Sequence, residues 1–294
     1  MPPIKVDNIR VDENVKNILQ IELQETYLAD MFLPTVKVRN DSGIVKTWGN
    51  EHMRSYDLKR SVHDMSLHYV ESEMGADGSY KINYYDIASQ VSVQLVDQEV
   101  APIDLFTIEA VALTESIKLN RDIALAAQLS STAVLTSNET LSGTSQWSDY
   151  TNSKPKTQID TSINTVLLNI SKKANSIFMS EQVATTLRNH PDYINLYGGA
   201  RGTVPGGVPS TAFAQLLKDV HGFKNVYIGS TVQITSKKGQ AETRGFVFGK
   251  DCVVFYRTDS PSTNSKSFGY SFVKDGSEVK RKHGSTKALK NSTT

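Results

Sequence analysis

The histidines in the first quarter of the chain are the first candidates for metal or acid–base chemistry. His52, His63 and His68 fall in one polar stretch, and the last two could meet across a turn. Two imidazoles that bind zinc from one helix face usually stand three or four residues apart, and no two of these do. The sequence also lacks His-Glu-x-x-His. We therefore expect no metal ligands here.

Other catalytic patterns are equally incomplete. The glycine-rich run Gly198–Gly207 lacks the Lys-Ser/Thr ending of a phosphate loop and the strand that precedes a dinucleotide fingerprint. No Gly-x-Ser-x-Gly occurs, and Cys252 lies in an apolar stretch typical of a buried thiol. A hydrolase or transferase that uses Ser148 stays open as an alternative, although no base stands at a defined spacing from it. We expect no catalytic residue and no cofactor.

The composition excludes several classes of protein. The chain has 294 residues, 32 Lys and Arg against 31 Asp and Glu, and one Cys. This balance argues against a protein that is basic throughout and coats nucleic acid, and a single Cys excludes a disulfide framework. We find neither a leader sequence nor an apolar run long enough to cross a membrane, so we expect a soluble protein. Ser and Thr total 56, which indicates much surface in loops and strands.

The N-terminal half of the chain predicts several strands and two helices, the second of which is long. A helix is expected over 12–29, strands over 32–39 and 44–48, and a returning strand over 79–84. The charged stretch between the last two strands has too few apolar residues for a core, so we expect a long hairpin arm that packs on something else. A helix over 103–131 is the strongest in the chain.

The C-terminal half alternates helices and strands. Helices are expected over 160–174, 180–188 and 209–220, and strands over 176–179, 226–228, 245–248 and 252–256. The last 21 residues, 274–294, carry six Lys/Arg against two Asp/Glu. Together these patterns predict an α+β chain of two lobes with a protruding arm.

Several segments resemble the major capsid proteins of tailed bacteriophages with the Hong Kong 97-type fold. The most specific is TLSGTSQWSDYTNSKP at 140–155. Arg188-Asn-His-Pro191, the segments within 226–256, Ser267–Phe272 and the segments within 29–49 support it in order and spacing. The resemblance runs from about 29 to 280.

The resemblance implies a division of the chain. Residues 1–43 are the N-terminal arm with the first strands, and 44–88 are an extended loop that lies over a neighbouring subunit. Residues 89–135 are a peripheral domain with the spine helix, and 136–257 are an axial domain. Residues 258–294 return to the peripheral domain and end in the basic tail.

The resemblance also implies a function and partners. It predicts a structural protein, not an enzyme, that self-assembles through pentamers and hexamers into an icosahedral head around double-stranded DNA, which it contacts without sequence specificity. Assembly takes place in the bacterial cytoplasm with a separate scaffolding protein, a portal and a maturation protease, and without a membrane. We expect subunit contacts at the charged arm and the glycine-rich loop: Arg54, Lys59, Arg60, Gly198, Gly199, Gly202, Gly206 and Gly207.

An alternative function for the same fold is the shell of a cellular compartment. The shell of a cellular, encapsulin-like nanocompartment would enclose an enzyme as cargo in place of DNA. Some members of the family crosslink a lysine of the extended loop to a neighbouring subunit. Lys59 lies in the corresponding region, and the sequence identifies no partner for it.

Overall fold

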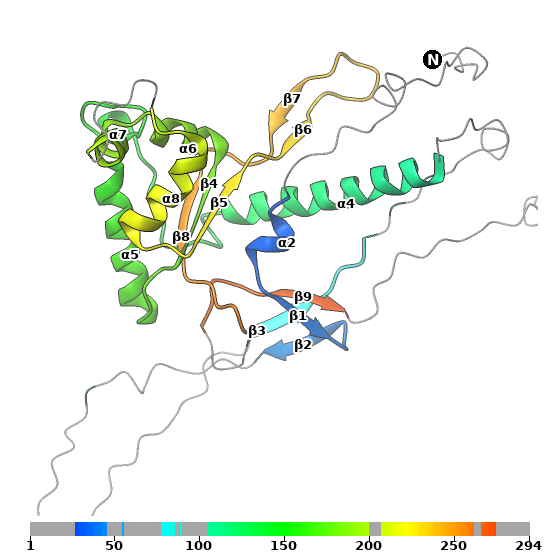
Figure 1. Cartoon of the computed structure of the whole chain (residues 1–294). Coiled ribbons are helices and arrows are strands. Elements are labelled where there is room, and N and C mark those ends of the chain that lie inside the picture. The colour runs from blue at the N-terminus through cyan, green and yellow to red at the C-terminus, as the bar shows by residue number, and fades with distance from the viewer. Residues whose placement is uncertain are drawn as a thin grey trace, which may run out of the picture. The chain divides into compact units, whose positions relative to one another are not determined.

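A computed structural model describes residues 27–45, 55, 78–85, 87, 89, 105–199, 207–261 and 266–274 (Figure 1). The chain divides into two compact units. The first comprises the described residues of Met1–Pro34, Tyr85–Asp259 and Lys266–Gly269, and the second those of Thr35–Tyr84, Ser260–Ser265 and Tyr270–Thr294.

A three-stranded sheet forms the centre of the first unit, with the strand order β5-β4-β8. The strand β4 (Ser176–Ser180) pairs in parallel with β5 (Asn225–Gly229) and antiparallel with β8 (Cys252–Phe255). All five residues of β4 are buried, as expected for a central strand covered on both faces. The helices of this unit are α2 (Ala29–Phe32), α4 (Leu105–Leu129), α5 (Pro155–Ile170), α6 (Glu181–Arg188), α7 (Pro191–Gly198) and α8 (Ser210–His221), with a 3-10 turn, η3, at Gly143–Ser145.

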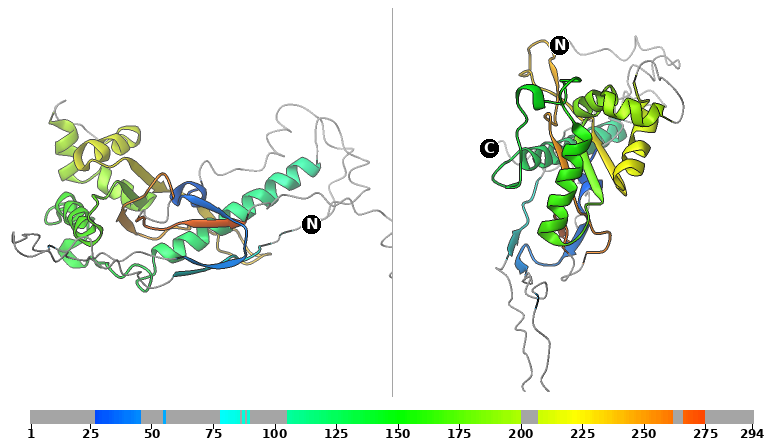
Figure 2. Two further views of the ribbon diagram at one scale, coloured as in Figure 1. Left: turned by 90° about the horizontal axis from the view of Figure 1, so that it is seen from below. Right: turned by 90° about the vertical axis from the view of Figure 1, so that its left-hand side faces the viewer.

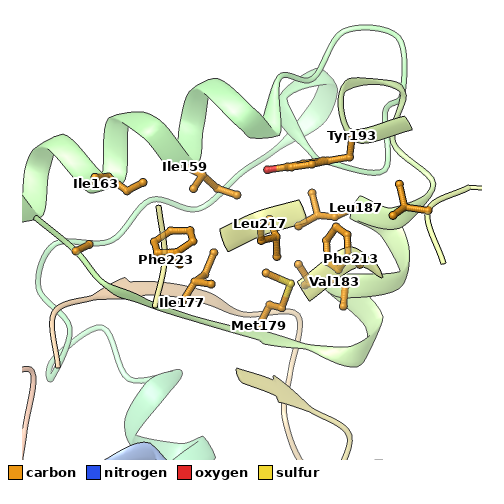
Figure 3. Packing of buried hydrophobic residues seen from close by; sticks show 13 residues of the cluster. Ile159, Ile163, Ile177, Met179, Val183, Leu187, Tyr193, Phe213, Leu217 and Phe223 are labelled. Atoms are coloured by element: carbon orange, nitrogen blue, oxygen red, sulfur yellow. The ribbon is translucent and has the colours of Figure 1, made fainter. Parts of the chain in front are cut away.

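Successive residues of β4 point to opposite faces of the sheet and so enter two different cores. Ile177 and Met179 belong to a cluster built with helices α5 to α8, which Figure 3 shows from close by. Phe178 points the other way and packs with Phe32 of α2 and with Leu125 of α4. The sheet is therefore covered by α5 to α8 on one face and by α2 and α4 on the other.

Local sequence signals fix the ends of these helices. The helix α5 begins with Pro155 at its first position and ends at Ser171, whose φ of 56° is left-handed. The Ser180 side chain caps α6 by accepting a hydrogen bond from the Val183 amide at 3.4 Å. The helix α8 ends at Gly222, which has a φ of 78° and needs no Cβ there.

A buried carboxylate joins the long helix to distant parts of the first unit. Asp122 of α4 is fully buried, and its Oδ1 accepts the Ala29 amide at 2.7 Å. Its Oδ2 accepts the Leu28 amide at 3.2 Å and the Thr231 hydroxyl at 2.6 Å. Asp122 thus supplies the N-terminal cap that α2 lacks in its own sequence, since the Leu28 side chain cannot accept a hydrogen bond.

The second unit contains two strand pairs. The strand β1 (Thr35–Val38) pairs in parallel with β9 (Ser271–Lys274), so residues more than 200 positions apart meet. The strand β2 (Ser42–Val45) pairs antiparallel with β3 (Gly78–Lys81). Tyr80 of β3 stacks on Phe272 of β9 with ring centroids 4.6 Å apart, which ties the two pairs together.

Most predicted elements of the described chain are present with shifted ends, and the expected hairpin is confirmed by the pairing of β2 with β3. The strand expected over 32–39 begins only at Thr35, because Phe32 ends α2. The helix expected over 160–174 starts and stops five and four residues earlier, where Pro155 and the left-handed Ser171 place its ends. Three elements were not predicted: α2, α7 and β6 (Val232–Ile234). The resemblance implied a closing strand at 267–272, and the observed strand β9 lies slightly later, at Ser271–Lys274. Most of the helix expected over 12–29 lies outside the described residues.

The helix expected over 103–131 is confirmed as α4, but its apolar stripe is not buried throughout. Ile117 is 40% exposed. The buried side chains of its described part, 108–129, are Asp122, Leu125 and Leu129, all in the C-terminal half. The hydrophobic pattern therefore located the helix without showing which part of it faces the core.

Replacing Asp122 tests how much the first unit depends on this carboxylate. We expect Asp122→Ala to lower the free energy of unfolding by about 2–4 kcal/mol, because it leaves two amides and a hydroxyl without their acceptor. Urea unfolding measures this. Asn120→Ala, an exposed change on the same helix, is the control and should have an effect within about 0.5 kcal/mol. Equal stability of the two variants would contradict the anchoring role.

Candidate functional site

One buried histidine–serine pair invites comparison with a catalytic pair. His190 Nε2 lies 3.0 Å from the Ser153 hydroxyl, and both residues are buried. However, His190 Nδ1 accepts the Asp192 amide hydrogen at 3.1 Å, so the ring proton must be on Nε2. Nε2 then donates to Ser153, whose own hydroxyl donates to the Asp149 carbonyl at 2.7 Å. A general base needs a lone pair toward the serine, so this pair is arranged to hold the fold.

A second buried histidine has the opposite tautomer. His221 Nδ1 donates to Asp160 Oδ1 at 2.7 Å, which leaves Nε2 to accept the Tyr193 hydroxyl at 3.1 Å. Burial lowers the pKa of His221, although the hydrogen bond to Asp160 opposes this shift. Burial also raises the pKa of Tyr193 well above its ordinary value. This network joins α5, α7 and α8 and stays neutral at the tyrosine and histidine.

The other residues considered for chemistry show no catalytic arrangement in the part of the chain that the structure describes. Cys252 is half-buried on β8, and burial raises its thiol pKa to about 12, as expected of an inert thiol. Ser148 is exposed, and no hydrogen bond joins it to either described histidine. His52, His63 and His68 lie outside the described residues. In the described part of the chain, no three His, Cys, Asp or Glu side chains are grouped to hold a metal ion.

The glycine-rich run begins one residue later than expected. Gly198 is the buried last residue of α7, and the exposed Gly199 follows it. At the other end, Gly207 has a φ of 84°, and a Cβ there would lie 2.5 Å from Asn189 Oδ1. The next amide, that of Val208, donates to the Arg188 carbonyl at 3.0 Å. Both ends of the run are thus fixed next to α6 and α7, while Gly202 and Gly206 lie outside the described residues.

The base of the predicted arm is described, although the arm itself is not. The hairpin register runs from Ser42 opposite Lys81 to Val45 opposite Gly78. An ion pair and a hydrogen bond lie beside this hairpin base. Lys274 Nζ is 2.6 Å from Asp41 and 2.8 Å from the Tyr84 hydroxyl. The predicted contact residues Arg54, Lys59 and Arg60 fall between the two strands and lie outside the described residues.

Sequence reasoning missed an exposed apolar ribbon. The strand β6 pairs antiparallel with β7 (Arg244–Phe246), and Figure 1 shows the pair extending away from the three-stranded sheet. Ile234 is 55% exposed and Phe246 46% exposed, and both point to the same side because Ile234 lies opposite Arg244. The alternation Val232-Gln-Ile234 was the available signal, but three residues are too short to stand out.

A two-stranded ribbon is marginal in water without something to cover one face. The ribbon segment 229–247 also carries Lys237, Lys238 and Arg244 against Glu242 alone. A basic, partly apolar ribbon of this kind is a candidate surface for a protein partner.

Comparisons with known proteins place the fold. No family model matches the chain. No curated protein matches it. Among solved structures, it is similar to a phage-related protein from Bordetella bronchiseptica, with a TM-score of 0.64 and 21% sequence identity. The alignment covers 91% of this chain and 84% of the other. At this identity the likeness shows a shared α+β fold.

None of the described helices is long and apolar enough to span a membrane.

The two buried histidines predict acid sensitivity. Burial lowers the pKa of both His190 and His221 below the ordinary 6.5, so the unfolded chain takes up their protons first as pH falls. Stability is therefore full above about pH 6.5 and is lost below it, by up to about 1.4 kcal/mol per pH unit for each histidine. Urea unfolding at pH 7.5 and 5.5, followed by tryptophan fluorescence, measures the loss.

A matched variant separates the histidines from other groups. His190→Asn keeps an acceptor for the helix cap but does not titrate, so the pH dependence of its stability should be smaller than that of the natural chain. An unchanged pH dependence in this variant would show that His190 does not contribute.

Proposed function

We propose that the protein is the major capsid protein of a tailed bacteriophage and assembles into an icosahedral shell around double-stranded DNA. The observation that carries the proposal is the likeness in fold to a phage-related protein over 91% of the chain. The resemblance of residues 140–155 to the Hong Kong 97-type capsid family supports the finer assignment. In the structure this stretch forms η3 and an ordered loop that leads into α5.

The surfaces fit such a role. A polar hairpin arm cannot bury a core of its own, and its base is paired over four residues of β2 and β3. An arm of this kind suits a contact with a neighbouring subunit, which the proposed function requires. The β6–β7 ribbon adds a second surface with exposed apolar side chains. Many weak contacts of this kind become strong in a closed shell, because each further contact is effectively intramolecular.

The described chemistry also favours a structural role over an enzyme. His190 is protonated on the nitrogen that faces Ser153, and His221 is held between Asp160 and Tyr193. Both therefore serve packing. The basic segment 274–294 would contact the packaged DNA through phosphates without reading its sequence.

Deleting the arm tests the proposal directly. The full chain, produced in bacteria with its scaffolding partner, should form closed particles that are visible by negative-stain electron microscopy. Replacing residues 46–77 by Asn-Gly would join Val45 to Gly78 in a tight turn that suits the observed register. We expect this variant to keep its thermal unfolding midpoint and to form no particles.

Two results would contradict the proposal. One is a natural chain that stays monomeric with its partner under all assembly conditions. The other is a set of particles that enclose a protein cargo and no DNA in infected cells, which would indicate a nanocompartment shell.

The ribbon gives an independent prediction. Ile234→Thr with Phe246→Thr keeps residues that favour strands but removes the exposed apolar surface. We expect at least a tenfold loss of particle yield with an unchanged unfolding midpoint, because only contacts outside the chain are lost. Gln233→Thr, on the other face of the ribbon, is the control and should assemble normally; equal assembly of both variants would exclude the ribbon as a contact.

A further inference from the structure

The solvent-facing side of α5 bears a stripe of residues that differs from an ordinary exposed helix surface. Figure 3 shows Ile159 and Ile163 pointing from this helix into the core. Opposite them, four exposed residues follow one another at intervals of four, three and four and so line one side of the helix: Thr157, Thr161, Asn164 and Leu168. Leu168 is 83% exposed, and Figure 1 and the right view of Figure 2 show α5 on the outside of the first unit.

The α5 stripe has no charged residue. From 161 to 171 the sequence contains no Asp, Glu, Lys or Arg, and the one charged residue between 157 and 168 is Asp160. That carboxylate lies beside the stripe and is already bound by Lys156 at 3.3 Å and by His221 at 2.7 Å. About a quarter of the residues of an ordinary protein are charged, and a loss of charge is typical of the centre of an interface. The stripe therefore has the composition of a contact surface.

The hydroxyl groups on this side of α5 are already bonded within the helix. The Thr161 hydroxyl donates to the Thr157 carbonyl at 2.9 Å, and the neighbouring Thr165 hydroxyl donates to the Thr161 carbonyl at 3.0 Å. A donor that has its partner inside its own helix keeps that bond when a contact expels water, whereas an unbonded donor is costly to bury. Covering the threonines therefore costs little, and covering Leu168 is favourable.

An uncharged stripe restricts what can cover it. It offers no cation to a nucleic-acid phosphate, and a charged protein surface would lose its hydration there without gaining an ion pair. A second α5 stripe is itself uncharged and also matches in shape. When two copies of the helix run antiparallel about a two-fold axis between residues 162 and 163, Leu168 of each copy faces Thr157 of the other. In the same register Asn164 faces Thr161, whose hydroxyl oxygen still has a lone pair for the Asn164 amide.

We propose that the α5 stripe is a contact surface for a second copy of this chain, in which two α5 helices pack antiparallel about a two-fold axis. The stripe is about 24 Å long and about 10 Å wide, or about 240 Å² per copy, against about 800 Å² per partner in a stable complex. This contact is therefore weak alone and gains strength in an assembly, where each further contact is effectively intramolecular. It is compatible with the proposed capsid function and does not depend on it.

Thiol crosslinking of the full chain tests the pairing, because covalent trapping accumulates a weak contact. Asn164→Cys places a thiol near the two-fold axis, about 5 Å along the helix from its counterpart in the other copy. Asn169→Cys is the matched control on the same helix, equally exposed, with its counterpart about 20 Å away. A bifunctional maleimide that spans less than about 10 Å, one helix diameter, should give at least fivefold more covalent dimer with Asn164→Cys. The natural chain, with Cys252 as its one thiol, gives the background.

Every other result overturns the proposal. Equal yields would indicate random collision, more dimer from Asn169→Cys would indicate a different register, and no dimer from either variant would show that the stripes do not meet. Leu168→Lys added to Asn164→Cys should reduce the dimer to the level of the control, because it places an unpaired charge in the contact. An unchanged yield there would also contradict the pairing. Circular dichroism checks that each variant is folded. The scaffolding partner is left out, so a failure to pair and a failure to form particles are separate results.

Discussion

The buried carboxylate of Asp122 is the contact on which the first unit depends most. It accepts hydrogen bonds from the start of α2 and from Thr231, which are 93 to 109 residues away in sequence. Burying a carboxylate is costly unless its oxygens are hydrogen-bonded, and here the three donors offset that cost. The consequence is that α4, the segment entering α2 and the connection after β5 are held in one arrangement. The aromatic cluster around Phe32 can form only once α2 is placed.

On the other face of the sheet, two neutral histidines take a comparable part. His190 caps α7. His221, at the end of α8, accepts a hydrogen bond from the hydroxyl of Tyr193, which lies on α7. Both bonds use a ring nitrogen without a proton, so protonation of either ring removes an acceptor. The helix α7 leads directly into the glycine-rich run. Its position, and so the start of that run, is determined by these two rings.

The second unit shows how a small sheet is completed by remote strands. The strands β1 and β9 come from the two ends of the described chain, and the stack of Tyr80 on Phe272 links them to the hairpin. Gly43 is needed for the same contact, since a Cβ there would lie 2.7 Å from the Tyr80 ring. In the proposed shell, the firmly built base of the hairpin and the exposed β6–β7 ribbon supply the surfaces that a subunit needs.

The sequence by itself determined the class and most elements, because these depend on near neighbours. Periodicity located α4 and α8, and Ser180 marked the start of α6. The helix α5 was also predicted, but it begins at Pro155, five residues before its expected start. Two strands around a polar stretch predicted the hairpin that β2 and β3 form. By contrast, α7 and β6 were not predicted because each is short. A hydrophobic pattern over so few residues cannot be distinguished from a chance arrangement.

Tertiary structure alone decided which polar residues matter. Nothing local distinguishes Asp122 from other acidic residues of the chain, since its partners come from distant segments. The tautomers of His190 and His221 likewise depend on what packs against each ring. Hydrophobic spacing showed that α4 has apolar positions, but only packing against the sheet decided that its C-terminal half is the buried part.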